Sequence, residues 1–439
     1  MSNYIQVGFG RTDIMPQGSV ELGGLGNGPF RKSENILDTL YATCIAITDG
    51  EGQTLLMITM DLLHAMQGMV ADIRKNITAA TGIPGEHIMI AATHTHAGPD
   101  IFNPGPQTVN DYIDQCVAKV PQAAIEALAD RKPARMYTGM KRVGYMNFVR
   151  HYKRRDGTCG GAAPENPLVG HMTQSDPRLR VVQFKREEGK DILLMNWQAH
   201  PCFTGQSYSK NISADYISSV RGYLEVMLGC HFAFFQGAGG NLTARTKIQT
   251  EPCEREMAAY GKRLGDEAVS LLGNMRELKP APLQFIRRQY QCPVDHSTDG
   301  QVPQATELWN YWLETGNVQE GYRRAKELGY GSPYQGRAVL ERASKPATEP
   351  LELNAVRLGE LALATAPCEM FDTCGAYVKD NSPVENTLML AYCNGSYGYF
   401  PTQYAFEYGC YEVDTHKYAP GSAEEMAENL VEMLHELNK

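Results

Sequence analysis

The sequence predicts a layered α/β protein in which helices flank a core of mixed β-sheet. Short apolar runs typical of buried strands alternate with longer segments whose apolar residues recur at helical spacing. Glycine and proline residues separate these runs at short intervals. No apolar run approaches the ~20 residues that a membrane-spanning helix needs, so we expect no membrane insertion.

The first third of the chain shows this alternation most clearly. Residues 40–48 and 54–59 are apolar runs joined by a glycine-containing turn, which is typical of a β-hairpin. Residues 66–80 carry apolar side chains at the spacing of an amphipathic helix. A buried strand at 87–90 and a helix at 110–129 follow. The order strand, helix, strand, helix indicates α/β layers.

The middle of the chain repeats the pattern after a loop-rich stretch. We predict strands at 179–184, 192–197 and 231–236 and a helix at 254–272. Ser213 has the residue type and the position of a helix N-cap, which predicts one more helix between the last two strands. These elements extend the same α/β layers.

Residues 294–350 differ in character from the rest of the chain. They are polar, contain two helical patterns and separate core-like strands at 283–293 and 351–366. A last helix at 422–437 closes the chain. We therefore expect a single domain, residues 1–439, with a helical insertion that could form a lid.

Composition argues against several classes of partner. The net charge of −9 disfavours binding to nucleic acid or anionic lipid, which both need basic patches. Eleven cysteines, an odd number without a Cys-x-x-Cys pair, fit reduced thiols better than a disulfide framework. The N-terminal residues show no secretory signal. We expect a cytoplasmic protein that acts on a small molecule, and homo-oligomerisation is left open.

A pair of histidines follows the strand at 87–90, where the strand gives way to a loop. His94 and His96 alternate with threonines, so their side chains point to the same side and could face one metal or one substrate. A single buried histidine is more often a satisfied core residue. The pair at this spacing favours a functional site.

Two more candidate ligands occupy equivalent places. His200 follows the strand at 192–197, and Glu369 follows the apolar stretch that ends at Ala366. Two histidines and one carboxylate from separate strands, with a fourth place open, form the ligand set of a catalytic zinc. Such a zinc lowers the pKa of bound water to about 7 and polarises a carbonyl group.

Other chemistries have less support in the sequence. The glycines at 237–240 either bring backbone N–H groups close to an oxyanion or a phosphate, or form a tight strand-to-helix turn. A serine triad has less support, because the sequence contains no Gly-x-Ser-x-Gly motif and Ser213 is explained as a helix cap. A thiol nucleophile at Cys202 or Cys368 stays open, although buried structural cysteines are more common.

Several motifs, taken together and in order, resemble the catalytic domain of the neutral/alkaline (non-lysosomal) ceramidases. They are Gly8-Phe9-Gly10-Arg11-Thr12-Asp13-Ile14, Thr93-His94-Thr95-His96-Ala97-Gly98-Pro99, the region from Asn147 to Arg150, Ala199-His200-Pro201 with Ser213-Ala214-Asp215-Tyr216, Gln236-Gly237-Ala238-Gly239-Gly240, Pro367-Cys368-Glu369, and Tyr397 to Thr402 with Tyr411-Glu412.

This resemblance implies the ceramidase catalytic fold and a mononuclear zinc amidase. It implies that the metal ligands are His94, His200, Glu369 and a tyrosine, for which Tyr399 is preferred and Tyr397 is the rival. It further implies that His96 and Arg150 bind or polarise the scissile group.

The sequence also departs from the ceramidase pattern. The family's glycine loop continues Gly-Asp with a serine or proline after it, whereas here it reads Gly240-Asn241-Leu242-Thr243. Thr243 is the hydroxyl left nearby and becomes the third catalytic candidate. Cys368 stands where the family has glycine, and we expect neither the secretion signal nor the C-terminal β-sandwich of ceramidases. We therefore expect a small, water-soluble amide, ester or glycoside-like conjugate as substrate, in place of membrane ceramide.

Two alternatives compete with this interpretation. A His-x-His pair also occurs in dinuclear amidohydrolases and in metallo-β-lactamase-like sites, although Asp100 lies at the wrong offset for the latter. The second alternative is a catalytically silent protein that keeps the metal for structure or for ligand capture. The altered loop at Asn241 favours it.

Overall fold

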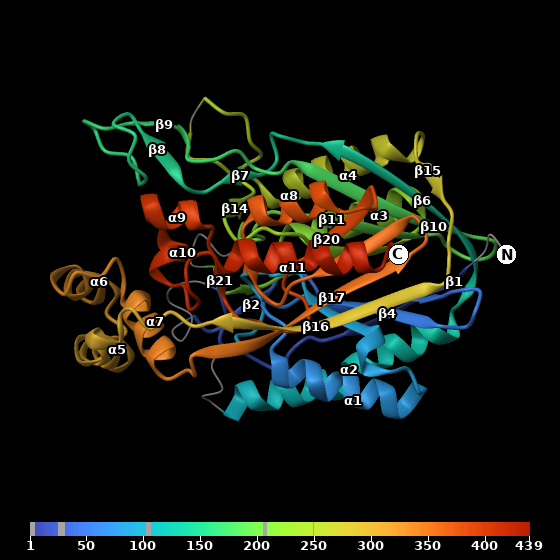
Figure 1. Cartoon of the computed structure of the whole chain (residues 1–439), viewed down its shortest axis with the longest axis horizontal. Helices are drawn as coiled ribbons and strands as arrows, with labels where there is room; N and C mark the ends of the chain where they lie inside the picture. The colour runs from blue at the N-terminus through green and yellow to red at the C-terminus, as the bar shows by residue number, and fades with distance from the viewer. Residues whose placement is uncertain (1–4, 25–30, 102–106, 205–208, 249) are drawn as a thin grey trace.

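Two β-sheets stack face to face at the centre of the molecule (Figure 1). The structure, a computed structural model, describes residues 5–24, 31–101, 107–204, 209–248 and 250–439. The strands of the larger sheet are β1 (Ile5–Asp13), β3 (Tyr41–Thr48), β4 (Thr54–Met60), β5 (Ile88–Ala92), β6 (Lys132–Arg142), β10 (Arg178–Arg186), β11 (Ile192–Trp197), β13 (His231–Gln236) and β15 (Arg276–Leu278). Those of the smaller sheet are β16 (Leu283–Pro293), β17 (Thr348–Leu358), β18 (Leu361–Thr365) and β20 (Asn386–Leu390).

Both sheets are mixed, as the sequence predicts. The nine-stranded sheet runs in the order β13-β11-β10-β6-β1-β3-β4-β5, with β15 paired to β6, and the four-stranded sheet runs β16-β17-β18-β20. Neighbouring strands pair antiparallel except β4 with β5, β11 with β13, and β18 with β20. Each parallel pair needs a crossover, and in each case a helix supplies it.

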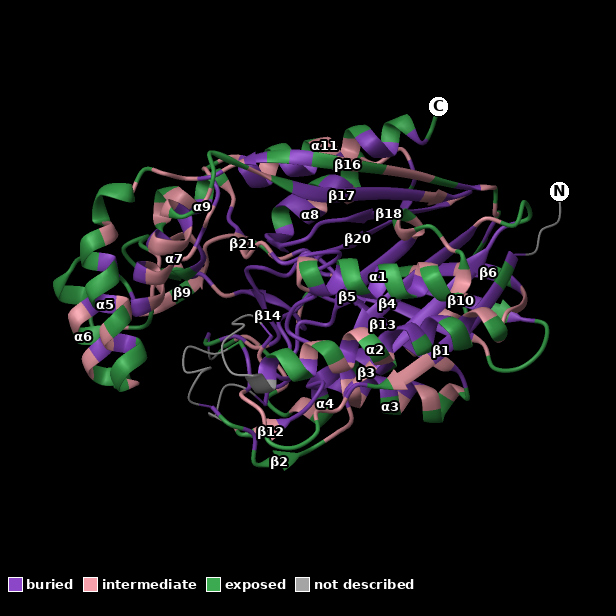
Figure 2. Cartoon of the chain, turned by 90° about the horizontal axis from the view of Figure 1, so that it is seen from below, coloured by how far each residue is buried: buried purple, intermediate pink, exposed green. Residues whose placement is uncertain are grey.

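Helices cover the outer faces of both sheets (Figure 2). The helices against the larger sheet are α1 (Gln67–Thr81), α2 (Gln107–Ala129), α3 (Tyr216–Leu228) and α4 (Met257–Leu272). Those against the smaller sheet are α8 (Asp372–Asn381) and α11 (Ser422–Glu436). The order of layers is therefore helix, sheet, sheet, helix, and the layered α/β prediction is confirmed.

Strand β1 shows how alternation divides side chains between these layers. Val7 packs into the apolar core between the two sheets, whereas Gly8 and Gly10 face α2. A Cβ on Gly8 would lie 2.0 Å from the backbone oxygen of Ala127, so only glycine lets the helix lie this close to the strand. The glycine-rich opening of the sequence is thus a packing feature of a strand.

Short strand pairs collect near the ends of the long strands. They are β2 (Asn35–Ile36) with β12 (Asn211–Ile212), β7 (Phe148–Val149) with β14 (Leu242–Thr243), β8 (Tyr152–Arg154) with β9 (Leu168–His171), and β19 (Glu369–Met370) with β21 (Tyr399–Phe400). The last pair is parallel and sets Glu369 opposite Tyr399. The backbones of two residues predicted as metal ligands therefore lie side by side on paired strands.

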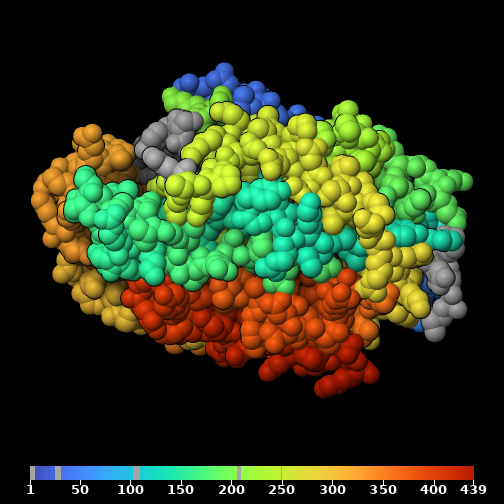
Figure 3. Space-filling model, turned by 90° about the horizontal axis from the view of Figure 1, so that it is seen from above, coloured from blue at the N-terminus to red at the C-terminus, as the bar shows by residue number. Residues whose placement is uncertain are grey.

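The predicted insertion contains three helices between β16 and β17. They are α5 (Val302–Thr315), α6 (Val318–Glu327) and α7 (Pro333–Ala343), and they share a small apolar cluster. In Figures 1 and 3 they lie at one end of the molecule, beside the C-terminal part of the chain. An ion pair from Glu341 to Lys417 at 2.8 Å joins α7 to the segment after α10 (Tyr411–Asp414). The single-domain assignment and the lid role stay predictions.

Some local predictions were wrong. The sequence predicted a loop-rich stretch before the strand at 179–184, but β6 lies inside that stretch. Helix α8 had no predicted counterpart. The N-cap of α3 is Asp215, whose carboxylate accepts from the Tyr216 N–H at 2.8 Å, and not Ser213. The Ser213 hydroxyl instead donates to the Asp38 carboxylate and accepts from the Asp215 N–H. None of the described helices combines the length and the apolar character that crossing a bilayer requires.

Candidate metal centre

Three ligand candidates from distant parts of the chain meet at the ends of their strands. The Nε2 atoms of His94 and His200 lie 3.2 Å apart. Glu369 Oε2 lies 3.1 Å from His94 Nε2 and 3.4 Å from His200 Nε2. The three atoms form a nearly equilateral triangle inside the protein, since all three residues are buried.

The opposite edge of each imidazole fixes its tautomer. His94 Nδ1 donates to the Leu63 carbonyl at 2.8 Å, and His200 Nδ1 donates to the carbonyls of Gly239 and Leu242 at 2.9 Å. Since a carbonyl can only accept, Nδ1 must carry the proton in each ring. The Nε2 lone pairs therefore point toward one another and toward the Glu369 carboxylate.

This arrangement fits a metal ion. A single extra proton could bridge only one edge of the triangle and would leave the other edges as contacts between lone pairs. A tetrahedral zinc with bonds of about 2.0–2.1 Å would set its donor atoms about 3.3 Å apart, which is close to the observed spacing. Histidines that donate Nδ1–H to carbonyls are also typical of metal ligands. The buried histidine and glutamate groups could hold a metal ion.

Electrostatics prepares these groups as ligands. Burial lowers the pKa of His200 to about 4, so its ring is neutral at physiological pH. Burial opposes ionisation of Glu369, but the neighbouring His94 and His200 outweigh it and hold the pKa of this carboxyl well below its usual value. A metal needs neutral imidazole and ionised carboxylate ligands, and the lowered pKa values of His200 and Glu369 favour these forms.

Backbone strain collects around the centre. His94 has φ +67°, in the left-handed region that residues with a Cβ avoid. Tyr392, with φ 55°, places its ring 4.2 Å from the His94 ring, and Asn394, with φ 67°, accepts the Ile90 N–H at 2.8 Å. Strained residues of this kind persist where the surrounding structure fixes them, as at functional sites.

His96 lies beside the triangle. Its Nε2 is 3.3 Å from His94 Nε2, and its Nδ1 donates to the Gly24 carbonyl at 2.7 Å. Burial and the nearby His94 lower the pKa of His96 well below its usual value. His96 could join His94 and His200 as a third nitrogen ligand, but the contacts of Glu369 Oε2 are with the other two.

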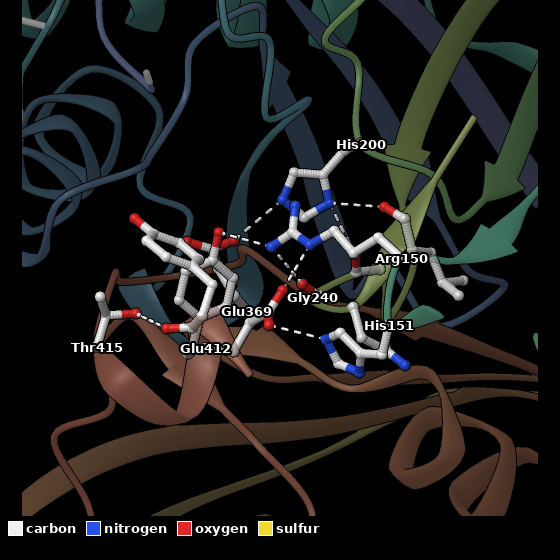
Figure 4. A network of polar contacts seen from close by, with 12 residues as sticks. Arg150, His151, His200, Gly240, Glu369, Glu412 and Thr415 are labelled. Atoms are coloured by element: carbon white, nitrogen blue, oxygen red, sulfur yellow. Dashed lines mark hydrogen bonds and ion pairs between the residues drawn. The ribbon is translucent and has the colours of Figure 1, made fainter. Parts of the chain in front are cut away.

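Arg150 lies next to His200 and Glu369 (Figure 4) and is hydrogen-bonded to Tyr399. Arg150 Nη2 donates to the Tyr399 hydroxyl at 3.0 Å, and the Tyr399 ring stands opposite Glu369 in the β19–β21 pair. The rival tyrosine is turned elsewhere, since the Tyr397 hydroxyl donates to the Pro350 carbonyl at 3.0 Å. Between the two tyrosines, the geometry favours Tyr399.

Two amides of the glycine loop after β13 are already engaged within the protein. The N–H groups of Gly237 and Gly240 donate to the carbonyls of Trp197 and Met370. A Cβ on Gly240 would lie 2.3 Å from the Glu369 carbonyl oxygen, so glycine is needed for close packing here. Of the two alternatives, the structure supports the tight turn.

The two altered residues of this loop have structural partners. Asn241 and Asp372 form a reciprocal pair, in which the amide donates at 2.6 Å and the Asp372 N–H returns a bond at 2.9 Å. The Thr243 hydroxyl accepts from the Arg245 N–H at 3.4 Å, and Thr243 bridges His200 through the backbone. A catalytic role for Thr243 stays a prediction.

Several neighbouring residues were missed as site candidates. Glu412 is buried and contacts both Arg150 and His151, and the Tyr411 ring meets the Tyr399 ring edge-on at 5.9 Å. The His64 ring lies 5.5 Å from the His94 ring. The sequence marked Tyr411-Glu412 only as part of a motif. Of the two candidate thiols, Cys368 is disfavoured, because burial raises its pKa well above the usual value, whereas Cys202 stays open.

The layers described above match the fold of solved ceramidase structures. One solved structure with this fold is a ceramidase complexed with C2, with a TM-score of 0.75, 19% identity, and coverage of 99% of this chain and 75% of the other. The neutral ceramidase from Pseudomonas aeruginosa aligns with a TM-score of 0.74, 19% identity, and coverage of 100% and 75%. No protein-family model and no curated protein matches the sequence. The fold that the resemblance implied is thus confirmed.

Proposed function

We propose that the protein is a zinc-dependent hydrolase that cleaves an amide bond of a small, water-soluble substrate. The observation that carries the proposal is the triangle of His94 Nε2, His200 Nε2 and Glu369 Oε2, in which every donor faces inward. The shared fold supports amide chemistry, because the similar solved structures are ceramidases. Tyr399 is the proposed fourth ligand.

The residues around the centre have complementary roles in this proposal. When bound, zinc would acidify a water molecule and polarise a carbonyl oxygen. The Arg150 guanidinium would donate to the carbonyl oxygen as negative charge develops on it. Because His96 Nδ1 holds the ring proton, we propose that its Nε2 accepts a proton and later returns it to the leaving amine. Burial of the whole centre strengthens each of these interactions.

The substrate part of the proposal rests on the local departure from ceramidases. Asn241 stands where the family has an acidic residue, and its amide is bonded to Asp372 instead of the centre. We infer that this side of the site accommodates a different group from that of ceramide. Esters and glycoside-like conjugates are alternatives that the test distinguishes.

The proposal is tested by metal analysis and by substrate screening of the purified protein. We expect one zinc per chain, and turnover of soluble amides above that of matched esters, glycosides and long-chain ceramide. Two metals per chain would support a dinuclear site instead. Good turnover of ceramide with none of the soluble compounds would contradict the substrate class. Bound zinc without any hydrolysis would support the catalytically silent protein.

A further inference from the structure

A second buried polar network lies beside the metal centre, around Glu412 (Figure 4). Glu412 is 1% exposed, and both of its carboxylate oxygens are in use. Oε1 accepts from Arg150 Nε at 2.5 Å, and Oε2 accepts from His151 Nε2 at 2.8 Å. Burial opposes ionisation, but Arg150 and His151 outweigh it and hold the pKa of Glu412 well below its usual value.

The outer end of the network is held by packing and by one more hydrogen bond. His151 is 4% exposed, and its ring lies between Phe371 and Tyr408, at 5.5 and 5.6 Å between ring centroids. His151 Nε2 donates to Glu412, and Nδ1 forms a hydrogen bond of 2.7 Å with the Tyr408 hydroxyl. The ring is therefore fixed on both edges and can anchor the carboxylate.

The inner end of the network fixes the guanidinium of Arg150. Nε is bound to Glu412, and Nη2 donates to the Gly240 carbonyl and to the Tyr399 hydroxyl, both at 3.0 Å. The backbone N–H of Arg150 donates to the Asn241 carbonyl at 2.9 Å. Nη1 has no hydrogen-bond partner among the residues that the structure describes. One donor edge of a rigidly held cation thus remains available.

We propose that Glu412 and His151 are positioning residues that hold Arg150 so that its Nη1 meets an anionic oxygen at the metal centre. The ligand class is a carboxylate, or a carbonyl oxygen that becomes an oxyanion in the reaction. Only the oxyanion part of this proposal rests on the proposed function. His151, Cys410 and Glu412 also offer grouped metal donors, but both Glu412 oxygens already have partners.

The first test is a double-mutant cycle on Glu412 and Arg150, with acetate as the probe. We expect Glu412→Gln to keep its zinc and to weaken acetate binding, measured by calorimetry, about tenfold or more. In the Arg150→Ala background the same change should have little further effect, because Glu412 acts through Arg150. Equal losses of affinity in both backgrounds would overturn the proposal.

The second test separates positioning from general destabilisation. His151→Gln keeps an amide N–H near the place of Nε2 and should retain most of the acetate affinity, whereas His151→Leu should lose it as Glu412→Gln does. Glu251→Gln is the control, since Glu251 forms a similar pair with His171 at 3.0 Å in which the Arg150 side chain takes no part. If His151→Gln and His151→Leu were equally impaired, the proposed role of His151 would be wrong.

The kinetic readout depends on the proposed function and is kept separate. For a substrate that the wild type hydrolyses, Glu412→Gln should lower kcat about 10- to 100-fold with KM nearly unchanged, because an oxyanion contact forms mainly in the transition state. If the wild type hydrolyses nothing, the proposed function fails, while zinc content and acetate affinity still decide the role of Glu412. Unchanged acetate affinity in Glu412→Gln would refute the positioning role under either outcome.

Discussion

Two buried polar clusters lie side by side in this protein and differ in one respect. In the network around Glu412, each acceptor faces a donor, and the carboxylate, the guanidinium and the imidazole satisfy one another. In the triangle of His94, His200 and Glu369, acceptors face acceptors. Because unsatisfied buried polar groups are costly, this difference favours a metal ion at the triangle, whereas the members of the first cluster satisfy one another.

The largest effect that this comparison predicts is loss of the metal. His94→Ala or His200→Ala removes one corner of the triangle and should abolish stoichiometric zinc binding and lower kcat/KM by about 10³-fold or more. His435→Ala, at an exposed histidine of α11, should change neither quantity. Metal analysis and steady-state kinetics measure both. Hydrolysis retained in both triangle variants would remove zinc from the mechanism.

The next prediction tests whether His96 is a metal ligand. If His96 acts on the substrate and does not bind the metal, His96→Ala should keep one zinc per chain and lower kcat by about 100-fold. Zinc content measured together with kcat separates the two roles. Loss of zinc in this variant would instead make His96 a ligand, in the place proposed for Tyr399.

Gly240 connects the two clusters, because its carbonyl binds Arg150 and its Cα lies against Glu369. In Gly240→Ala the added Cβ would lie 2.3 Å from the Glu369 carbonyl oxygen, so we expect a loss of about 1–3 kcal/mol of unfolding free energy and weaker zinc binding. Gly222→Ala in α3, where a Cβ meets nothing within 4 Å, is the matched control and should be neutral or stabilising. Denaturant titration and zinc competition measure the effect; equal stability of the two variants would contradict the expected clash.

The smallest effect concerns Asp414, two residues after Glu412. Burial and the Glu412 charge raise the pKa of Asp414 to about 6. A carboxyl whose pKa is raised on folding stabilises the protein below its unfolded pKa of about 4, and this contribution is lost as the pH rises through about 6. At pH 8 the Asp414→Asn variant should therefore be more stable than the wild type by about 1 kcal/mol of unfolding free energy, after allowance for solvent screening. At pH 5 the gain should be smaller. A gain that persists unchanged in a Glu412→Gln background would show that Glu412 is not the charge responsible.

The sequence predicts much of the fold because burial leaves a periodic pattern. The strands at Ile192–Trp197 and His231–Gln236 are mostly apolar, and the structure has them at the predicted bounds. Strand β6 escaped prediction because one of its faces is largely exposed, and its polar residues and Gly139 dilute the apolar pattern. Helix α8 includes Gly375, where a Cβ would lie 2.3 Å from Ala238, and close packing of this kind weakens the helical signal.

The candidate site was predicted in part for a related reason. His94, His200 and Glu369 stand directly after strands, so locating the strands located these residues. Glu412 gives no comparable signal, because its partner Arg150 lies 262 residues away and only the folded chain brings them together. The tight turn at Gly240 and the direction of Tyr397 likewise depend on contacts between distant segments.

The helical insertion has a further consequence for how the chain can vary. Strands β16 and β17 pair from Leu283–Leu358 to Pro293–Thr348, and the Val294 N–H donates to the Ala347 carbonyl at 3.0 Å. The two ends of the insertion therefore meet at a closed ladder. Because the entropy of loop closure grows only slowly with length, by about 0.6 kcal/mol per doubling, segments of different length can replace residues 295–346 as a unit. Such an exchange would alter the surroundings of α10 while leaving the strand pairing of both sheets intact.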